Sequence, residues 1–86
     1  MPEVSRFYGI VVRMYYDEHP PPHFHVAYQD AQAVLRIDTL EVSRGHLPRR
    51  ALSLVVEWAL AHRHELRQNW ERAERGEPIV EIAPLE

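Results

Sequence analysis

The apolar residues of this chain follow two different periods, one in each half. In the first half, residues 7–16, 23–28 and 33–38 alternate apolar and polar side chains and are rich in β-branched and aromatic types. A period of two is typical of strands whose two faces differ, although Val11 blurs it in the first segment. A turn at residues 29–32 separates the second and third segments, so we expect three strands joined as an antiparallel meander.

The alternation also predicts which side chains share a face of this sheet. The apolar face collects seven residues: Ile10, Val12, Met14, Phe24, Val26, Leu35 and Ile37. The opposite face collects polar side chains: Arg13, Tyr15, His23, His25, Arg36 and Asp38. A turn that pairs Tyr28 with Ala33 sets the register. The cross-strand pairs that follow from it are His25 with Arg36, and His23 with Asp38.

The second half of the chain has the period of a helix. From residue 48, a proline, to residue 75, apolar residues recur every three or four positions, and Gly76 followed by Pro78 gives a stop signal. A continuous helix of this span would be roughly 42 Å long, whereas a compact chain of this size has a radius of gyration of about 12 Å. We therefore expect either a break near residues 61–63 or a projecting second half that packs on a partner. The tail, residues 79–85, is apolar enough for a final strand or for an arm across a neighbouring molecule.

Composition places the chain among small globular proteins. With 86 residues, 45% of them hydrophobic and 27% charged, residues 1–86 can form a single domain with one core. No cysteine is present, which excludes disulfides and thiolate metal sites. The N-terminus lacks the pattern of a secretory signal and no apolar run approaches the roughly 20 residues of a membrane helix, so we expect a cytoplasmic protein with no membrane partner.

These patterns together predict an α+β fold. It consists of a three-stranded antiparallel meander packed on one long or kinked C-terminal helix, with an extended C-terminal tail. Residues 41–43 are a candidate for a further short edge strand.

Candidate chemistry concentrates in one loop, where three of the six histidines frame a triple proline. His23 and His25 leave the same face of a strand about 6.6 Å apart, which is a recognised arrangement of metal ligands. In a polyproline II conformation His19 lies about 12 Å farther along the chain than His23. Asp17 and Asp38 are nearer candidates, and we take His23, His25 and Asp38 as the ligand set for a divalent metal such as zinc. A histidine pair on a wetted sheet face without any metal is the simpler alternative.

A second interpretation is metal-free chemistry on a phosphodiester. A histidine would act as general acid or base while Arg13, Arg36 or both stabilise the charge of the phosphate. The candidate catalytic residues are His23, His25, Arg13, Arg36 and Tyr15. The formal net charge of −3 argues against a protein that coats long nucleic acid, but it allows a local basic patch. The same side chains also suit the solvated face of an antiparallel sheet that has no catalytic function.

A third interpretation is a binding module. The proline loop, the aromatic first strand and the amphipathic helix offer surfaces for another protein, and the helix or the tail could join two copies of this chain in a homodimer.

Five parts of the chain carry a resemblance to a known family: Met1 to Val12, Pro21 to His25, Leu47 to Leu52, Glu57-Trp58, and Asn69-Trp70 with Gly76-Glu77-Pro78. Together they resemble, essentially from end to end, the bacterial family called domain of unknown function 4160. That family has no assigned activity, and none of its proline-histidine motif residues is identified as catalytic. Its genes often lie beside a second small uncharacterised gene, which has placed them among candidate toxin–antitoxin pairs.

The resemblance implies a partner more than a reaction. We expect a component of a two-gene, toxin–antitoxin-like module that acts through a protein encoded by the neighbouring gene, with room for an RNA-directed activity. The alternative is a small metal-binding or metal-dependent enzyme that uses the His-x-His pair.

Overall fold

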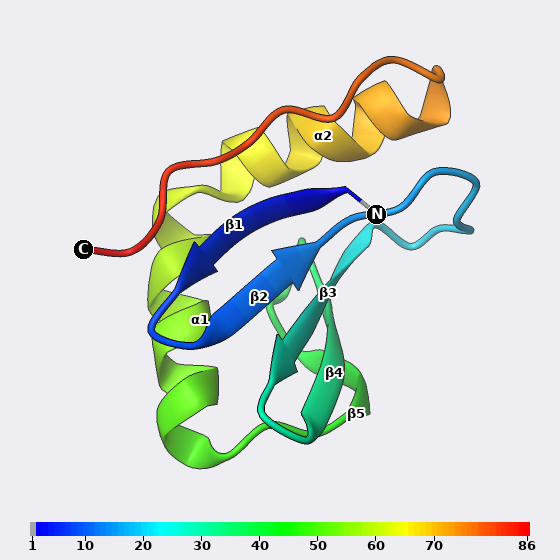
Figure 1. Cartoon of the computed structure of the whole chain (residues 1–86). Coiled ribbons are helices and arrows are strands. Elements are labelled where there is room, and N and C mark those ends of the chain that lie inside the picture. The colour runs from blue at the N-terminus through cyan, green and yellow to red at the C-terminus, as the bar shows by residue number, and fades with distance from the viewer. Residues whose placement is uncertain (1) are drawn as a thin grey trace.

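The computed structural model describes residues 2–86 and contains one antiparallel sheet, two helices and an extended C-terminal tail (Figure 1). Five strands lie side by side in the order of the sequence: β1 (Glu3–Phe7), β2 (Ile10–Arg13), β3 (His23–Tyr28), β4 (Ala31–Arg36) and β5 (Val42–Gly45). The helices α1 (Arg49–Ala61) and α2 (Arg63–Glu74) follow. The α+β class and the antiparallel sheet are therefore confirmed. Met1, with which the predicted single domain begins, lies outside the described residues.

The prediction of three strands was wrong, because the sheet has five. The predicted strand over residues 7–16 is interrupted by a two-residue turn at Tyr8 and Gly9, which separates β1 from β2. Both turn residues have positive φ, 51° and 79°. Tight hairpins favour this backbone because its twist matches the twist of the flanking strands. The fifth strand, β5, includes most of the segment expected as a short edge strand.

The hairpin of β3 and β4 is also tighter than expected. Its turn consists of residues 29–30 alone, with Gln29 at φ 52°. The observed cross-strand pairs are Tyr28 with Ala31, His25 with Val34, and His23 with Arg36. The predicted register was therefore wrong by two residues. A shift of two leaves every side chain on its predicted face, because the side-chain period of a strand is two.

The core lies between the sheet and the helices (Figure 1). All seven residues assigned to the apolar face are buried, each with at most 2% of its surface exposed. The Trp58 ring of α1 is completely buried and contacts the rings of Phe7 and Phe24, at centroid distances of 5.4 and 6.2 Å. Aromatic contacts of this kind add to the stabilisation that burial of apolar surface provides.

The predicted helix over residues 48–75 is divided in two. Helix α1 ends at Ala61 and α2 begins at Arg63, because the backbone of His62, at φ −122° and ψ 23°, leaves the helical region. Of the two alternatives, the structure has the break expected near residues 61–63, and a single long helix is not confirmed. The resulting chain is compact, with a radius of gyration of 11.7 Å. Within residues 2–86, neither helix has the length and apolar character needed to cross a membrane.

The C-terminal tail, residues 77–86, is extended and binds its own chain. The Trp58 indole N–H donates to the Ala83 carbonyl oxygen at 2.8 Å, and the Ile82 amide donates to the Val4 carbonyl oxygen at 2.8 Å. Ile82 is only 4% exposed. Figure 1 shows the tail returning along α2 toward β1, so the segment expected as a strand or as an arm serves as an extended strap on its own chain.

Candidate functional site

The outer face of the sheet, opposite the core, collects the predicted polar residues. Arg13 of β2 pairs with His25 of β3, and His23 pairs with Arg36 of β4. Tyr15, just after β2, lies with its ring 4.7 Å from the His25 ring in an edge-on contact. The alternation of the strands thus brings the five candidate catalytic residues to one face.

An acidic residue that was not predicted completes a cluster with the two histidines. Glu18 Oε1 lies 2.8 Å from His25 Nε2 and 3.1 Å from His23 Nε2. One ligand atom from each of the three residues lies within 4.8 Å of the others. All three side chains are partly buried, with 16% of His23, 24% of Glu18 and 30% of His25 exposed. The cluster therefore joins two imidazoles and one carboxylate at a site that solvent can reach.

The ring of His23 is held in one orientation. Its Nδ1 lies 2.9 Å from the carbonyl oxygen of Pro21, and a carbonyl oxygen only accepts hydrogen bonds, so Nδ1 carries a proton and donates it. The ring also contacts the indole of Trp70 of α2 at a centroid distance of 5.0 Å. Together these contacts direct Nε2 toward Glu18.

This orientation leaves two acceptor atoms facing each other in the cluster. A neutral imidazole with its proton on Nδ1 has a lone pair on Nε2, and an ionised carboxylate offers only acceptors. The 3.1 Å contact between His23 Nε2 and Glu18 Oε1 would then join two acceptors. A cation bound between the three ligand atoms would take a lone pair from each of them and remove the conflict.

The loop between β2 and β3 explains why Glu18 was missed. Its backbone turns at Asp17, with φ 61°, and the Pro20–Pro21 peptide bond is cis. Glu18 lies back against His25, seven residues later in the chain, with 2.8 Å between Oε1 and His25 Nε2. His19 is exposed and its ring is not part of the cluster. In the sequence, the signal for Glu18 was that an acidic residue precedes a short proline run between two strands that pair.

Asp38, the third ligand of the predicted metal set, lies elsewhere. Its position is beyond the end of β4, and its Oδ1 accepts hydrogen bonds from Arg67 of α2 at 2.6 and 3.1 Å. The expected pairing with His23 fails because the register differs by two residues, so Glu18 takes the place beside the histidines that Asp38 was expected to fill.

Three hollows meet around this cluster. The first, of about 360 Å³, extends from Glu18 and the histidines over β4 and β5 to Arg36 and Arg44. The second, of about 470 Å³, lies on the other side of His25 and includes Arg13 and Tyr15.

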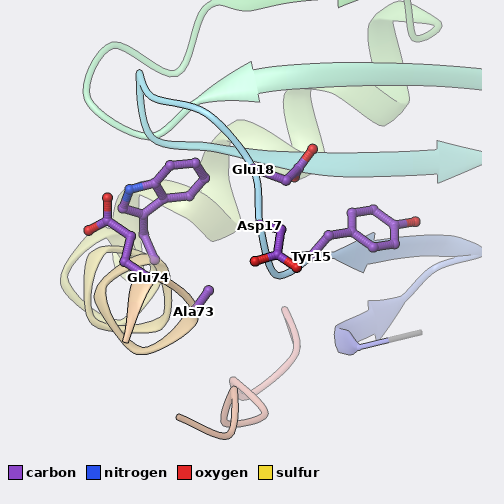
Figure 2. A pocket seen from close by; sticks show the side chains of 6 residues that line it. Tyr15, Asp17, Glu18, Ala73 and Glu74 are labelled. Atoms are coloured by element: carbon purple, nitrogen blue, oxygen red, sulfur yellow. The ribbon is translucent and has the colours of Figure 1, made fainter. Parts of the chain in front are cut away.

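The third hollow, of about 250 Å³, lies between the loop and α2 and is acidic. Figure 2 shows Asp17 and Glu18 on the loop and Glu74 on the helix, with the carboxylate of Glu18 directed away from α2 toward the strands. Glu18 thus lines both this acidic hollow and the first one.

Comparison of the sequence with protein-family models finds one matching family. Residues 9–71 match the family described as a domain of unknown function, DUF4160. The chain belongs to this family. No curated protein and no solved structure matches the chain.

The DUF4160 match contains the cluster and the first two hollows. It begins within the β1–β2 turn and ends in α2, so it includes all the lining residues of the first two hollows and excludes β1 and the tail. The resemblance found in the sequence is thus confirmed for the part of the chain that builds the site.

The outer face of this DUF4160 domain carries arginine side chains whose positive charge is not balanced by carboxylates. Among residues 2–86, the guanidinium groups of Arg13, Arg36 and Arg44 form no ion pair with a carboxylate. Arg6 does form one, with Glu3 at 2.8 Å; this hydrogen bond lowers the pKa of Glu3, and the charge of Arg13 lowers it further. The groove beside the cluster is therefore positively charged, although the chain as a whole carries −3.

Proposed function

We propose that this protein binds a divalent transition-metal ion through Glu18, His23 and His25 and acts as a small metal-dependent hydrolytic enzyme. The observation that carries the proposal is the convergence of three ligand atoms on one point, with Nε2 of each histidine facing the same carboxylate oxygen.

The residue types suit such an ion. Two imidazoles and one carboxylate are a ligand set for zinc in hydrolytic enzymes and for ferrous iron in oxygenases. The bond from His23 Nδ1 to the Pro21 carbonyl oxygen is the kind of supporting contact that fixes the tautomer and the direction of a metal-binding histidine. Glu18 Oε1 lies 2.8 Å from His25 Nε2 and 3.1 Å from His23 Nε2. A small outward movement of Glu18 would give each of these three atoms a bond of about 2.0–2.2 Å to one ion.

Three protein ligands leave at least one coordination position open. An ion with an open position makes a bound water acidic enough to lose a proton near neutral pH, which supplies a nucleophile for hydrolysis. The first hollow, of about 360 Å³, gives a substrate access to this position. An ion in this place would also remove the conflict between the two acceptors at His23 and Glu18.

The test is a calorimetric titration of the wild-type protein with zinc alone. We expect one ion per chain, and we expect Glu18→Gln and His25→Gln to lose the binding. The matched controls are Asp17→Asn, beside Glu18 in the same loop, and Asp38→Asn, whose carboxylate pairs with Arg67; both should bind like the wild type.

Circular dichroism spectra establish that each variant is folded. Wild-type affinity no greater than that of Glu18→Gln would refute the metal centre. Loss of binding in Asp38→Asn would instead restore the ligand set expected from the sequence.

A protein partner encoded by a neighbouring gene stays a prediction, as do the toxin–antitoxin-like role and the cytoplasmic location. Four large apolar side chains are exposed within residues 2–86: Tyr8, Tyr16, Leu60 and Val80. Co-purification of the tagged protein with the product of the adjacent gene tests the partner, and recovery of the tagged protein alone from cells that express both genes would contradict it.

A further inference from the structure

The two hollows on either side of His25 form one groove across the sheet. They share His25, Val34 and Arg44 as lining residues, so they adjoin along the row in which β3, β4 and β5 pair these three positions. Arg13 continues the same row on β2. Because neighbouring strands are about 4.8 Å apart, the Cα atoms of Arg13 and Arg44 are roughly 14 Å apart, with His25 between them.

The charge of the groove favours an anionic ligand on both sides of the cluster. Arg13 lies on one side of His25, and Arg36 and Arg44 lie on the other. Among residues 2–86, Glu18 is the only carboxylate that lines either hollow, and its Oε1 already faces both histidines. Guanidinium groups bind phosphate through paired hydrogen bonds, so three of them without carboxylate partners suit a ligand with several phosphates.

An aromatic side chain lies in the same groove. Tyr15 lines the hollow that also contains Arg13, and its ring is in edge contact with His25, at a centroid distance of 4.7 Å. Single-stranded nucleic acids bind where a positively charged groove follows the backbone and aromatic rings stack on unpaired bases. A duplex does not expose the faces of its bases in this way.

We infer that the substrate of the proposed metal centre is a single-stranded nucleic acid, an inference that rests on the proposed function and names its substrate class. The strand lies across β2 to β5, with one phosphate over the cluster, phosphates on either side at the arginines, and a base on Tyr15. This local groove accounts for nucleic-acid binding by a chain whose net charge is −3.

The test measures fluorescence anisotropy of a short labelled single-stranded RNA, of DNA with the same sequence, and of the corresponding duplex. The zinc-loaded wild type should bind a single strand more tightly than the duplex. In the double variant Arg36→Gln/Arg44→Gln, loss of two phosphate contacts should weaken binding about 25-fold at ~0.1 M salt. The slope of log affinity against log salt concentration should become shallower, from about −2 to about −0.7.

Two matched controls separate the groove from general charge. Arg49→Gln/Arg50→Gln makes the same change in net charge at the exposed start of α1 and should bind like the wild type. Tyr15→Leu should bind about tenfold more weakly, since stacking on one base contributes about 1.4 kcal/mol, whereas Tyr15→Phe, which retains the stacking ring, should bind more tightly than Tyr15→Leu.

The outcomes distinguish this inference from the proposed function. If zinc binds but the groove variant and the helix control bind RNA equally, or if the duplex binds as tightly as the single strand, the inference is overturned and the metal centre stands. If binding of the single strand depends on Arg36 and Arg44 even in EDTA, the groove is supported, and the zinc titration alone decides the metal centre.

Discussion

At the scale of single residues, Asn69 fixes the C-terminal tail to α2. Its side chain is completely buried, donates to the Val80 carbonyl oxygen at 2.7 Å and accepts from the Val80 amide at 2.9 Å. Arg72 donates to the same side-chain oxygen at 3.0 Å. One amide therefore replaces the backbone partner that a neighbouring strand would give the tail.

Replacement of this residue should loosen the tail before it unfolds the domain. We expect Asn69→Ala to lower the free energy of unfolding by about 2–3 kcal/mol, because three hydrogen bonds are lost at a buried position. Urea denaturation measures this change, and hydrogen exchange should become faster at the Val80 amide. The control is Gln68→Ala, the preceding residue of α2, which should change stability by about 0.5 kcal/mol or less. If hydrogen exchange at the Val80 amide is as slow in Asn69→Ala as in the wild type, Asn69 does not fix the tail to α2.

The candidate site also shows what single residues reveal in a sequence. The period of the strands was sufficient to place His23 and His25 on one face with Arg13, since only alternation decides the face. Glu18 could not be predicted in the same way, because its position depends on the path of an irregular loop. Of the loop residues, only Asp17 and His19 were considered as partners of the histidines, and the residue between them lies 2.8 Å from His25.

At the scale of elements, short turns decide the number of strands and their register. The turn at Tyr8 and Gly9 and the two-residue turn after β3 both contain a residue other than glycine with positive φ. Tyr8 and Gln29 are not residues that mark such turns in a sequence, so one strand was missed and one register was wrong. The break between α1 and α2 was easier to locate, because the apolar stripe of the helix thins at residues 61–63.

The attachment of β5 to β4 depends on Gly45. It has φ +73°, and a Cβ atom there would overlap the backbone carbonyl oxygen of Gln32. We expect Gly45→Ala to lower the free energy of unfolding by at least about 3 kcal/mol, through backbone strain and steric overlap together. Gly76→Ala is the matched control, since Gly76 has φ +72° and, among residues 2–86, only Gly76 itself and its two chain neighbours can lie within 4 Å of the position of a Cβ.

The control should lose only about 1 kcal/mol, the contribution of the backbone alone. Thermal and urea denaturation of both variants measures the difference. If both variants lose the same free energy of unfolding, the overlap with Gln32 costs nothing in Gly45→Ala. The close approach of Gly45 to Gln32 then does not determine how β5 attaches to β4.

At the scale of the whole molecule, folding and the candidate site are coupled. The cluster takes Glu18 from a loop and the histidines from β3, and the ring of His23 packs on Trp70 of α2. The loop is further connected to the tail, because the Tyr16 hydroxyl accepts a hydrogen bond from the Ile79 amide at 3.0 Å. A ligand that holds Glu18 and the histidines together therefore stabilises a point where sheet, helix and tail meet.

Zinc should consequently raise the thermal stability of the whole domain. At a free zinc concentration about 100 times the dissociation constant, binding to the native state alone adds about 2.7 kcal/mol to the free energy of unfolding. For a domain of this size, that increase corresponds to a rise in Tm of roughly 10–20 °C. Differential scanning calorimetry measures it, and EDTA should reverse it. Glu18→Gln should show no rise, whereas Asp17→Asn should match the wild type. A similar rise in Glu18→Gln would mean that zinc binds at other histidines, and the link between the cluster and the fold would then fail.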